Sequence, residues 1–272
     1  MHALRVIYII WLREFKAFMR EKGRIIGMIG QPLLYLLIVG QGIASGMSLN
    51  RAAGFDYLKY IYPGILGMSV LFTSVFSALS IIWDREFGFL KEVLVAPVPR
   101  WSVAMGKICG GATIAMMQSA ILIALAPFVG VKLSVLVVLE LLLLCFLISF
   151  AVTSLGVLIA ARMRSMQGFQ MLMNFLIMPI YFLSGAMFPV ASAPRWMQVL
   201  MTIDPLTYGV DALRNVIYSE TTAEVGGSAI SLVDMARESG LIRWSLGMDL
   251  GLCILVAGLL AVVASYVFST AD

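Results

Sequence analysis

The sequence predicts an all-α polytopic membrane protein with six transmembrane helices, an amphipathic helix before them, and short re-entrant helices between the last two spans. Only 12% of its 272 residues are charged and 61% are hydrophobic, whereas soluble domains carry about 25% charged residues. The mean hydropathy is +0.98. A spanning helix needs roughly 20 mostly apolar residues. Six segments meet this requirement: about 25–46, 60–82, 104–130, 133–160, 169–190 and 249–269.

If the chain crosses the membrane six times, its lysine and arginine residues are divided unevenly between the two sides of the membrane. Twelve of the 19 lie in the N-terminal arm, the loop 83–107 and the turn 162–164, and seven lie on the other side. Because loops rich in Lys and Arg stay in the cytoplasm, we expect both termini there. The net charge of +4 is therefore interpreted as a topology signal and not as a nucleic-acid-binding surface.

Residues 3–22 are predicted to form an amphipathic helix rather than a span. At about 100° per residue, its apolar side chains share one arc, and basic residues such as Arg5, Arg13 and Lys16 gather on the other. Two roles stay open for this helix: a membrane anchor on anionic headgroups, or packing on the loop 83–100. The chain thus divides into a cytoplasmic interfacial helix, 1–24, and a transmembrane domain, 25–272. All three cysteines fall in predicted spans, and no Cys/His spacing indicates a metal site.

The loop 83–107 contains a predicted amphipathic helix that ends at Pro97 and Pro99. Proline lacks an amide hydrogen and disfavours helical geometry in the residue before it. One acid, Glu86, falls in the apolar arc. The apolar arc holds Phe87, Phe89, Leu90, Val93, Leu94 and Ala96, and the polar arc holds Asp84, Arg85, Gly88, Lys91 and Glu92. The segment is either a solvated connector or a surface for a soluble partner, and its large apolar face favours the partner.

Polar side chains inside the predicted spans have two interpretations. Gln31 precedes Pro32 in the first span, Gln118 lies in the third, and Asn174 lies in the fifth. We favour interhelical hydrogen bonds over ligand contact for all three amides. Glu140 is either an intramembrane carboxylate, which is a functional candidate by default, or an acid that reaches the outer interface.

The segment 189–248, between the fifth and sixth spans, is predicted to be external. Residues 195–203 are too apolar for an exposed loop and too short to span, and short re-entrant helices would explain both facts. Asp204 followed by Pro205 predicts a helix start, with an acceptor at the N-cap and proline at the first helical position.

Two further features belong to this external segment. Asp211 and Arg214 are three residues apart and can pair on the surface of the predicted helix. From 219 to 248 the chain turns polar, with glycines as helix breakers, which indicates a small external cap.

Taken together, these features resemble the membrane subunits of type-2 ABC exporters, the family that contains daunorubicin-resistance and nodulation-factor export permeases. The resemblance covers nearly the whole chain, although the segment 219–248 is longer than in many relatives. Four features match in order: the amphipathic N-terminal helix, Arg85–Gly88 leading to Ala96–Arg100, Leu183–Gly185 leading to Phe188–Pro189, and Asp204–Tyr208 leading to Arg214.

The resemblance implies a dimer, most simply a homodimer, of six-span subunits joined to two separate cytoplasmic ATPases in the cytoplasmic membrane of a prokaryote. The ATPases would bind ATP and Mg, because this sequence has no G-x-x-x-x-G-K-[ST] phosphate loop and no cofactor motif of its own. The loop 83–100 would contain the coupling helix. The expected contact residues are Glu86, Phe87, Gly88, Leu90 and Leu94.

The resemblance also implies an export path. We expect it between the first, second and fifth spans of the dimer, near Gln31, Asn174 and Phe182. An amphipathic or lipid-like substrate would suit it, such as a drug, a lipid or a lipid-linked glycan. The segment matching 189–215 would form re-entrant helices at the outer end of the path. The residues assigned to this external re-entrant segment are Pro189, Trp196, Pro205, Tyr208, Asp211 and Arg214.

Two other functional classes stay open. A lipid-modifying membrane enzyme would place His, Asp-rich or Arg clusters at the interface, and this sequence has one histidine and no paired carboxylates at a span end. An ion-coupled secondary transporter would be favoured by several intramembrane acids or an inverted repeat, and Glu140 is the single candidate acid. The sequence therefore favours a transport permease over an enzyme.

Overall fold

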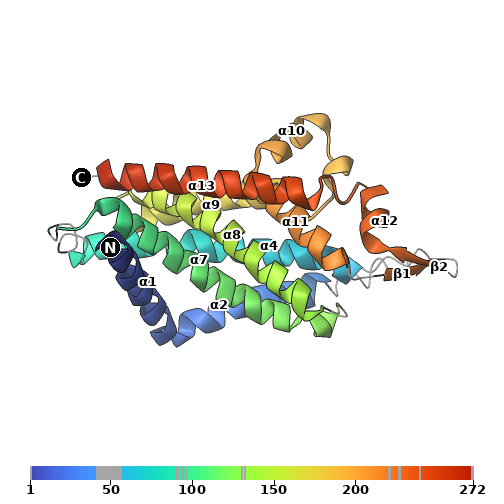
Figure 1. Cartoon of the computed structure of the whole chain (residues 1–272), viewed down its shortest axis with the longest axis horizontal. Helices are drawn as coiled ribbons and strands as arrows, with labels where there is room; N and C mark the ends of the chain where they lie inside the picture. The colour runs from blue at the N-terminus through green and yellow to red at the C-terminus, as the bar shows by residue number, and fades with distance from the viewer. Residues whose placement is uncertain are drawn as a thin grey trace.

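In the computed structural model, long helices form a bundle with both ends of the chain at the same end (Figure 1). A β-hairpin extends from the opposite end. We call these the terminal end and the hairpin end. The structure describes residues 2–40, 57–89, 92, 95, 97–129, 131, 133–219, 222–225, 228–238 and 240–270.

The described elements follow one another as helices, with two short strands late in the chain. They are α1 (His2–Arg20), α2 (Lys22–Leu34), the π-helical turn η1 (Tyr35–Gly40), α4 (Tyr57–Ser77), α5 (Leu79–Glu86), α7 (Arg100–Ala124), η3 (Ala126–Val129), α8 (Val135–Ala160), α9 (Met166–Leu183), η4 (Val190–Ser192), α10 (Arg195–Ile203), α11 (Pro205–Ser219), β1 (Thr222–Val225), β2 (Ser228–Ser231), α12 (Leu232–Glu238) and α13 (Leu246–Thr270).

Among the described residues, five helices are long and apolar enough to cross a membrane, and they correspond to the predicted second to sixth spans. The predicted first span, 25–46, starts in α2 and continues through η1 to Gly40. The rest of that prediction lies outside the described residues. The five helices are Ile61–Glu86 (α4 with α5), Arg100–Ala124, Val135–Ala160, Met166–Leu183 and Leu246–Thr270.

Two features correct the fold predicted from the sequence. The chain is not purely α-helical, because β1 pairs antiparallel with β2 inside the external segment 189–248. The second span is also longer than 60–82: it continues to Glu86, and the chain then turns at Gly88, whose φ is +79°. Glycine adopts a positive φ without steric cost. Asp84 and Arg85 therefore end the span and do not share one helix with the apolar residues after Gly88.

Helix α8 lies at the centre of the bundle and contacts α4, α7, α11 and α13. Small residues let these helices approach closely. A Cβ atom at Gly111 of α7 would lie 2.7 Å from Thr153 Cγ2 of α8, and one at Gly156 of α8 would lie 2.9 Å from Ala78 Cβ. The crossing of α4, α7 and α8 is thus set by side chains that pack directly on glycine. The cavity and the loop described below are built on these three helices.

The position of Glu140 in α8 favours the interface over the membrane interior. It is the sixth residue of the helix and is exposed. With 26 residues, α8 is about 39 Å long, compared with about 30 Å for the hydrocarbon core. A helix of this length that stood upright would extend beyond the core, and Glu140 lies within two turns of its first residue.

Helix α1 packs across α7 at the terminal end, where two glycines of α7 form a shallow groove (Figure 1). A Cβ atom at Gly106 would lie 2.7 Å from Ile10 Cβ, and one at Gly110 would lie 2.8 Å from Glu14 Cβ. The indole of Trp11 donates to Thr113 Oγ1 at 2.9 Å. The amphipathic helix is therefore part of the helix bundle, whatever contact it also makes with lipid.

This groove gives a first prediction. Gly110→Ala should lower the free energy of unfolding by about 1–3 kcal/mol, because the new methyl group must displace α1 from α7. Thermal or SDS unfolding of the purified chain in detergent measures the change.

Gly251→Ala is the matched control, since nothing lies within 4 Å of a Cβ atom at Gly251 of α13. Alanine there should stabilise the helix by up to about 1 kcal/mol. If both substitutions stabilise the chain, the close packing of α1 on α7 is wrong.

Candidate functional site

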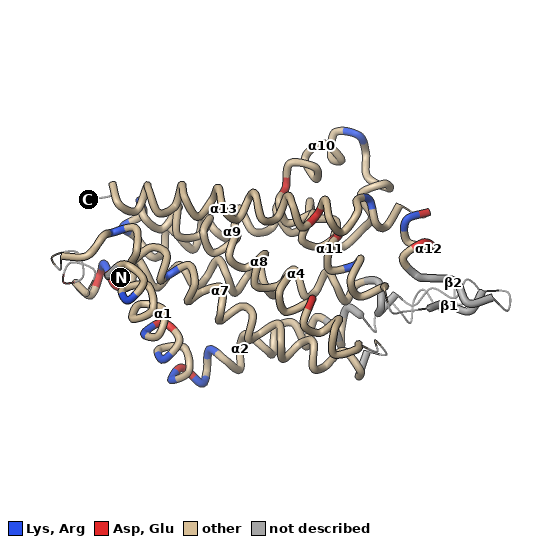
Figure 2. The backbone as a smooth tube through the Cα atoms, viewed as in Figure 1, with Lys and Arg blue, Asp and Glu red and all other residues tan. Residues whose placement is uncertain are grey.

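Many of the charged residues lie at the terminal end of the molecule, along α1 and the neighbouring helix ends (Figure 2). Lys107 of α7 lies at the centre of this group and is 4% exposed. Its Nζ atom donates to Glu14 Oε1 of α1 at 2.7 Å, to Ser80 Oγ of α5 at 3.1 Å, and to Asp84 Oδ2 of α5. Arg13 pairs with the same two carboxylates. We call Arg13, Glu14, Asp84 and Lys107 the ion cluster.

The ion cluster joins three elements in one largely buried network. Burial alone would favour the neutral form of Glu14, but the charges and hydrogen bonds of Lys107 and Arg13 outweigh it and hold the pKa of Glu14 below its ordinary value. Two cations and two anions also balance the net charge of the site. Glu14 therefore stays ionised, and the cluster binds α1 to α5 and α7.

The loop that follows the ion cluster carries the residues expected to contact a partner. Glu86 and Phe87 are exposed, Phe87 at 83%, and Gly88 makes the turn. The predicted contact residues Leu90 and Leu94 lie outside the described residues. An arginine of α1 does reach this region, but Arg13 pairs with Asp84 instead of Glu86, and its guanidinium lies 4.0 Å from the centre of the Phe89 ring. Of the two roles considered for α1, packing on the loop 83–100 is confirmed by these contacts.

Arg85 attaches the start of the loop to the end of α8. Its guanidinium donates to the carbonyl oxygens of Met163 and of Ala161, the latter at 2.8 Å. A cation is favourable at this position because the last carbonyls of a helix are unpaired and carry partial negative charge. The indole of Trp83 also donates to Met166 Sδ at 3.0 Å. The loop therefore begins from a junction fixed to α1, α7, α8 and α9.

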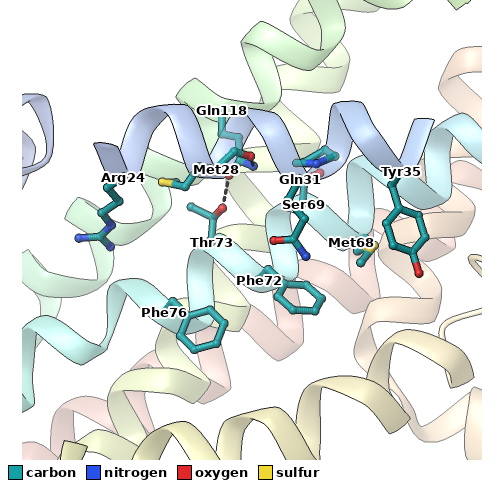
Figure 3. Close-up of a pocket in the computed structure, with 12 residues that line it drawn as sticks. Arg24, Met28, Gln31, Tyr35, Met68, Ser69, Phe72, Thr73, Phe76 and Gln118 are labelled. Carbon is teal, nitrogen blue, oxygen red and sulfur yellow. Dashed lines mark hydrogen bonds between the residues drawn. The ribbon is translucent and has the colours of Figure 1, made fainter. Parts of the chain in front are cut away.

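A cavity of about 270 Å³ lies between α2, α4 and α7. Its wall includes Gln31, Tyr35, Phe72 and Phe76, and Arg24 lies at one end (Figure 3). Phe72 and Phe76 project from successive turns of α4, with ring centres 6.3 Å apart. Two aromatic rings, an amide and one guanidinium offer surfaces for a ligand that is mostly apolar and partly polar. Gln31, one of the residues expected near the export path, lines this cavity.

Pro32 and Gln118 together determine how α2 forms the wall of this cavity. Pro32 lies inside α2 and has no amide hydrogen, so the carbonyl of Met28, four residues earlier, loses its helical donor. Gln118 of α7 supplies the missing donor: its Nε2 atom lies 2.6 Å from the Met28 oxygen. Thr73 Oγ1 of α4 donates to the other end of the same amide. The prediction that Gln118 makes interhelical hydrogen bonds is confirmed, and it joins three helices.

The other two residues predicted for the path lie elsewhere. Asn174 and Phe182 are on the exposed side of α9, and neither lines the cavity of Gln31. The large apolar side chains exposed on α9 are Met171, Leu172, Phe175, Met178 and Phe182. A single subunit therefore does not bring Gln31 together with Asn174 and Phe182.

At the hairpin end, the predicted helix start at Asp204 is confirmed. Helix α11 begins at Pro205, and Asp204 Oδ1 accepts the amide of Leu206 at 3.0 Å. Burial raises the pKa of Asp204 to about 7, against the opposing effect of that hydrogen bond. Tyr208 donates to the Thr202 carbonyl at 2.7 Å, which connects α11 to α10. Short helices thus occupy the segment where the sequence predicted them, with Pro189 just before η4 and Trp196 exposed on α10.

Asp211 and Arg214 are buried, which corrects the expectation that they lie on a helix surface. Asp211 Oδ2 accepts the amides of Arg243 and Trp244 at 3.1 and 3.0 Å. Burial raises the pKa of Asp211, although these amides and nearby arginines oppose the rise. Arg214 donates to the carbonyls of Gly185 at 2.6 Å and of Leu241 at 3.3 Å. The two side chains thus bind the segments before and after α11 to it.

Sequence reasoning missed the ion cluster. It assigned Lys107 to the loop 83–107 and used it for topology, whereas the structure buries it. One signal was present: Lys107 also falls inside the predicted third span, 104–130, where a lysine needs a partner. The partners Glu14 and Asp84 are 93 and 23 residues away, and no local pattern connects them.

The proline site gives a double-mutant prediction. Gln118→Leu leaves the Met28 carbonyl without a donor and should cost about 1–3 kcal/mol of unfolding free energy. In a Pro32→Ala background, the alanine amide can donate to that carbonyl, so the same substitution should cost at least about 1 kcal/mol less. The lost bond to Thr73 is common to both backgrounds and cancels. Equal costs in the two backgrounds would contradict this role of Gln118.

The ion cluster gives another prediction. Lys107→Met should lower the free energy of unfolding by about 3–5 kcal/mol, because Glu14 and Asp84 stay buried with a single remaining cation. Lys22→Met, at the exposed start of α2, should change it by less than about 0.5 kcal/mol. Unfolding in detergent compares the two, and a small effect of both would mean that the cluster does not stabilise the junction.

Comparison with known proteins identifies the family to which this sequence belongs. Residues 5–218 match the family described as ABC-2 type transporter. A putative transport permease, ycf38, from Cyanophora paradoxa is 28% identical over 224 residues, which cover 80% of this chain and 76% of that protein. Nodulation protein J of Rhizobium leguminosarum bv. trifolii is 26% identical, covering 79% and 82%. The inner membrane transport permease YadH of Escherichia coli K12 is 28% identical, covering 75% and 80%.

These matches confirm the resemblance inferred from the sequence motifs. The family match covers most of the chain and includes the ion cluster, the cavity and the short helices α10 and α11. With its apolar helices, the molecule is a multi-pass membrane protein and a transport permease rather than an enzyme. The chain belongs to the ABC-2 type transporter family.

Proposed function

We propose that this chain is the membrane-spanning subunit of an ABC exporter in the cytoplasmic membrane of a prokaryote, driven by separate ATPase subunits. The observation that carries this proposal is the loop after α5. It presents the exposed Phe87 at the terminal end, while the ion cluster and Arg85 attach its base to α1, α7 and α8. A force applied to such a loop is transmitted to the spans and is not absorbed by a flexible connector.

The path of the chain supports six spans with both termini in the cytoplasm. Helix α1 lies at the terminal end, and α4 begins toward the hairpin end, so the intervening segment must cross the bundle (Figure 1). Helix α2 and η1 cover residues 22–40, about 28 Å of helix, which is close to the thickness of the hydrocarbon core. The excess of Lys and Arg at the terminal end supports a cytoplasmic location for that end.

The coupling step follows from this placement. ATP and Mg bind in the partner ATPase, which presses on the loop 83–100 when it closes. Phe87, Leu90 and Leu94 supply apolar contact, Gly88 supplies the turn, and the exposed Glu86 meets a basic group of the ATPase. The rigid junction then moves α4, α5 and α7 together, and two permease subunits rock to open a path outward.

The path itself combines surfaces that one subunit keeps apart. The cavity beside Gln31 opens between α2 and α4, whereas Asn174 and Phe182 lie on the exposed side of α9. A second copy of the chain, packed against this side in a homodimer, would enclose both surfaces. Aromatic walls with a few amides and one arginine suit an amphipathic substrate, such as a drug, a lipid or a lipid-linked glycan. The short helices α10 and α11 then act as re-entrant helices at the outer end.

Substitutions in the loop test the proposal. Leu90→Asp and Phe87→Asp, made separately and together, should weaken ATPase binding at least about tenfold, because an apolar contact is replaced by a buried charge. Glu86→Ala should also weaken binding, because the basic group of the ATPase loses its partner. Co-purification with a stand-alone ABC ATPase expressed together with the permease, followed by measurement of ATP hydrolysis in liposomes, provides the readouts.

Val135→Asp is the control for these variants. Val135 is 79% exposed at the first residue of α8, at the other end of the bundle, where an acid is favourable. The control should assemble normally. If the loop variants also assemble and hydrolyse ATP at the normal rate, the coupling assignment is wrong.

A further inference from the structure

A second cavity, of about 460 Å³, lies at the hairpin end. It opens between the segment that contains η4 and α10 and the turn that follows α12. It is separate from the loop, the ion cluster and the cavity beside Gln31. The six lining residues are Ala191, Gln198, Arg237, Gly240, Ile242 and Arg243. We call it the arginine pocket.

The arginine pocket carries two positive charges with no matching acid in its lining. Arg237 and Arg243 are exposed, and neither forms an ion pair within 4.0 Å with any acid of the described part of the chain. The buried acid behind them, Asp211, already accepts the amides of Arg243 and Trp244. Two guanidinium groups with free donors suit an oxyanion such as a phosphate, which accepts paired hydrogen bonds.

The backbone of the pocket is held rigidly before any ligand arrives. Gly240 has a φ of +71°, and a Cβ atom there would lie 2.7 Å from Ala191 Cβ. The amides of Leu241 and Ile242 donate to the Ala236 carbonyl at 2.8 and 3.1 Å. The guanidinium of Arg214 in α11 donates to the Leu241 carbonyl. The two arginines are thus carried on a turn fixed to both α11 and α12, which reduces the entropy lost when a ligand binds.

An apolar surface lies on the opposite face of the helix that forms one wall of the pocket. The large apolar residues exposed on α10 are Trp196, Val199, Leu200 and Ile203, spaced as one stripe along the helix, while Gln198 faces the pocket. A short helix with such a stripe lies along a membrane surface, with the stripe in the acyl region. Trp196 also favours the level of the headgroups. The arginine pocket would then lie beside lipid phosphates.

From this combination we propose that the arginine pocket binds the headgroup of an anionic phospholipid at the outer surface of the membrane, with the acyl chains along the stripe of α10. The apolar stripe lies on one face of α10, and the two arginines lie on the turn beside its other face. A ligand with an acyl chain and an anionic headgroup can contact the stripe and the arginines together. A free phosphate ion can contact only the arginines, so an experiment can distinguish binding of a lipid from binding of phosphate.

The test uses the full chain in lipid nanodiscs that contain a small fraction of photoreactive phosphatidylglycerol, with a diazirine in its headgroup. Adducts are mapped by mass spectrometry. Labelling is expected on peptides that contain residues 191–198 and 237–243. In Arg237→Gln/Arg243→Gln it should fall about tenfold or more, as expected when two charge-assisted contacts are lost. Arg237→Lys/Arg243→Lys keeps the charge and should retain most of the labelling.

Controls separate this site from general attraction to anionic lipid. Arg5→Gln/Lys16→Gln removes two charges from α1 at the other end and should leave labelling of the two outer peptides unchanged. Unfolding temperatures equal to that of the unsubstituted chain show that the variants are folded. The proposal is wrong if the outer peptides are not labelled, or if the Gln double variant is labelled as strongly as the unsubstituted chain. It is also wrong about the lipid if millimolar inorganic phosphate displaces the label completely.

Discussion

The arrangement of the terminal end depends on one buried cation, Lys107. Its ammonium group lies between carboxylates from α1 and α5 and cannot be moved without leaving Glu14 and Asp84 partly unpaired. Arg13 completes the network and neutralises its net charge. Because the three helices meet at one point, the amphipathic helix, the end of the second span and the third span have fixed relative positions. The exposed loop begins directly from this point.

A second constraint comes from the backbone of α2. In a membrane-embedded helix, a carbonyl without a donor is costly, because no water is available to replace it. Pro32 creates such a carbonyl at Met28, and Gln118 satisfies it from α7. The same amide also lines the cavity beside Gln31. One side chain of α7 therefore both replaces the missing hydrogen bond of α2 and forms part of the cavity wall.

The hairpin end uses charge in a different way. Arg214 and Asp211 are charged residues of α11, yet both bind backbone groups of the neighbouring segments. Helix α11 is too short to span the membrane, and these two buried side chains fix its position relative to the neighbouring segments. The exposed arginines of the arginine pocket lie on the segment that this arrangement fixes. The buried charges of the ion cluster join helices, whereas Asp211 and Arg214 at the hairpin end hold loops.

Local pattern accounts for the elements that the sequence predicted correctly. The N-terminal amphipathic helix, the spans from the second to the sixth, and the helix start at Asp204 each follow from periodicity, length or a cap within a few residues. The turn at Gly88 and the β-hairpin were missed because both depend on the backbone conformation of a few residues in a segment without strong periodicity. Gln31 lines a cavity, whereas its sequence pattern favoured an interhelical hydrogen bond, because the pattern of one helix does not show what the neighbouring helices leave open beside it.

The amino-acid sequence by itself thus determined the membrane class, the order of the spans and the polar residues that need partners. It did not determine which partners they have. Asp84 and not Glu86 binds Arg13, Lys107 is buried between helices far apart in the chain, and Gln118 completes a helix 90 residues away. Hydrophobic periodicity reports which face of each helix is apolar, but helix crossings decide which side chains meet. The close approach of α1, α4, α7 and α8 at small residues is a property of the tertiary structure alone.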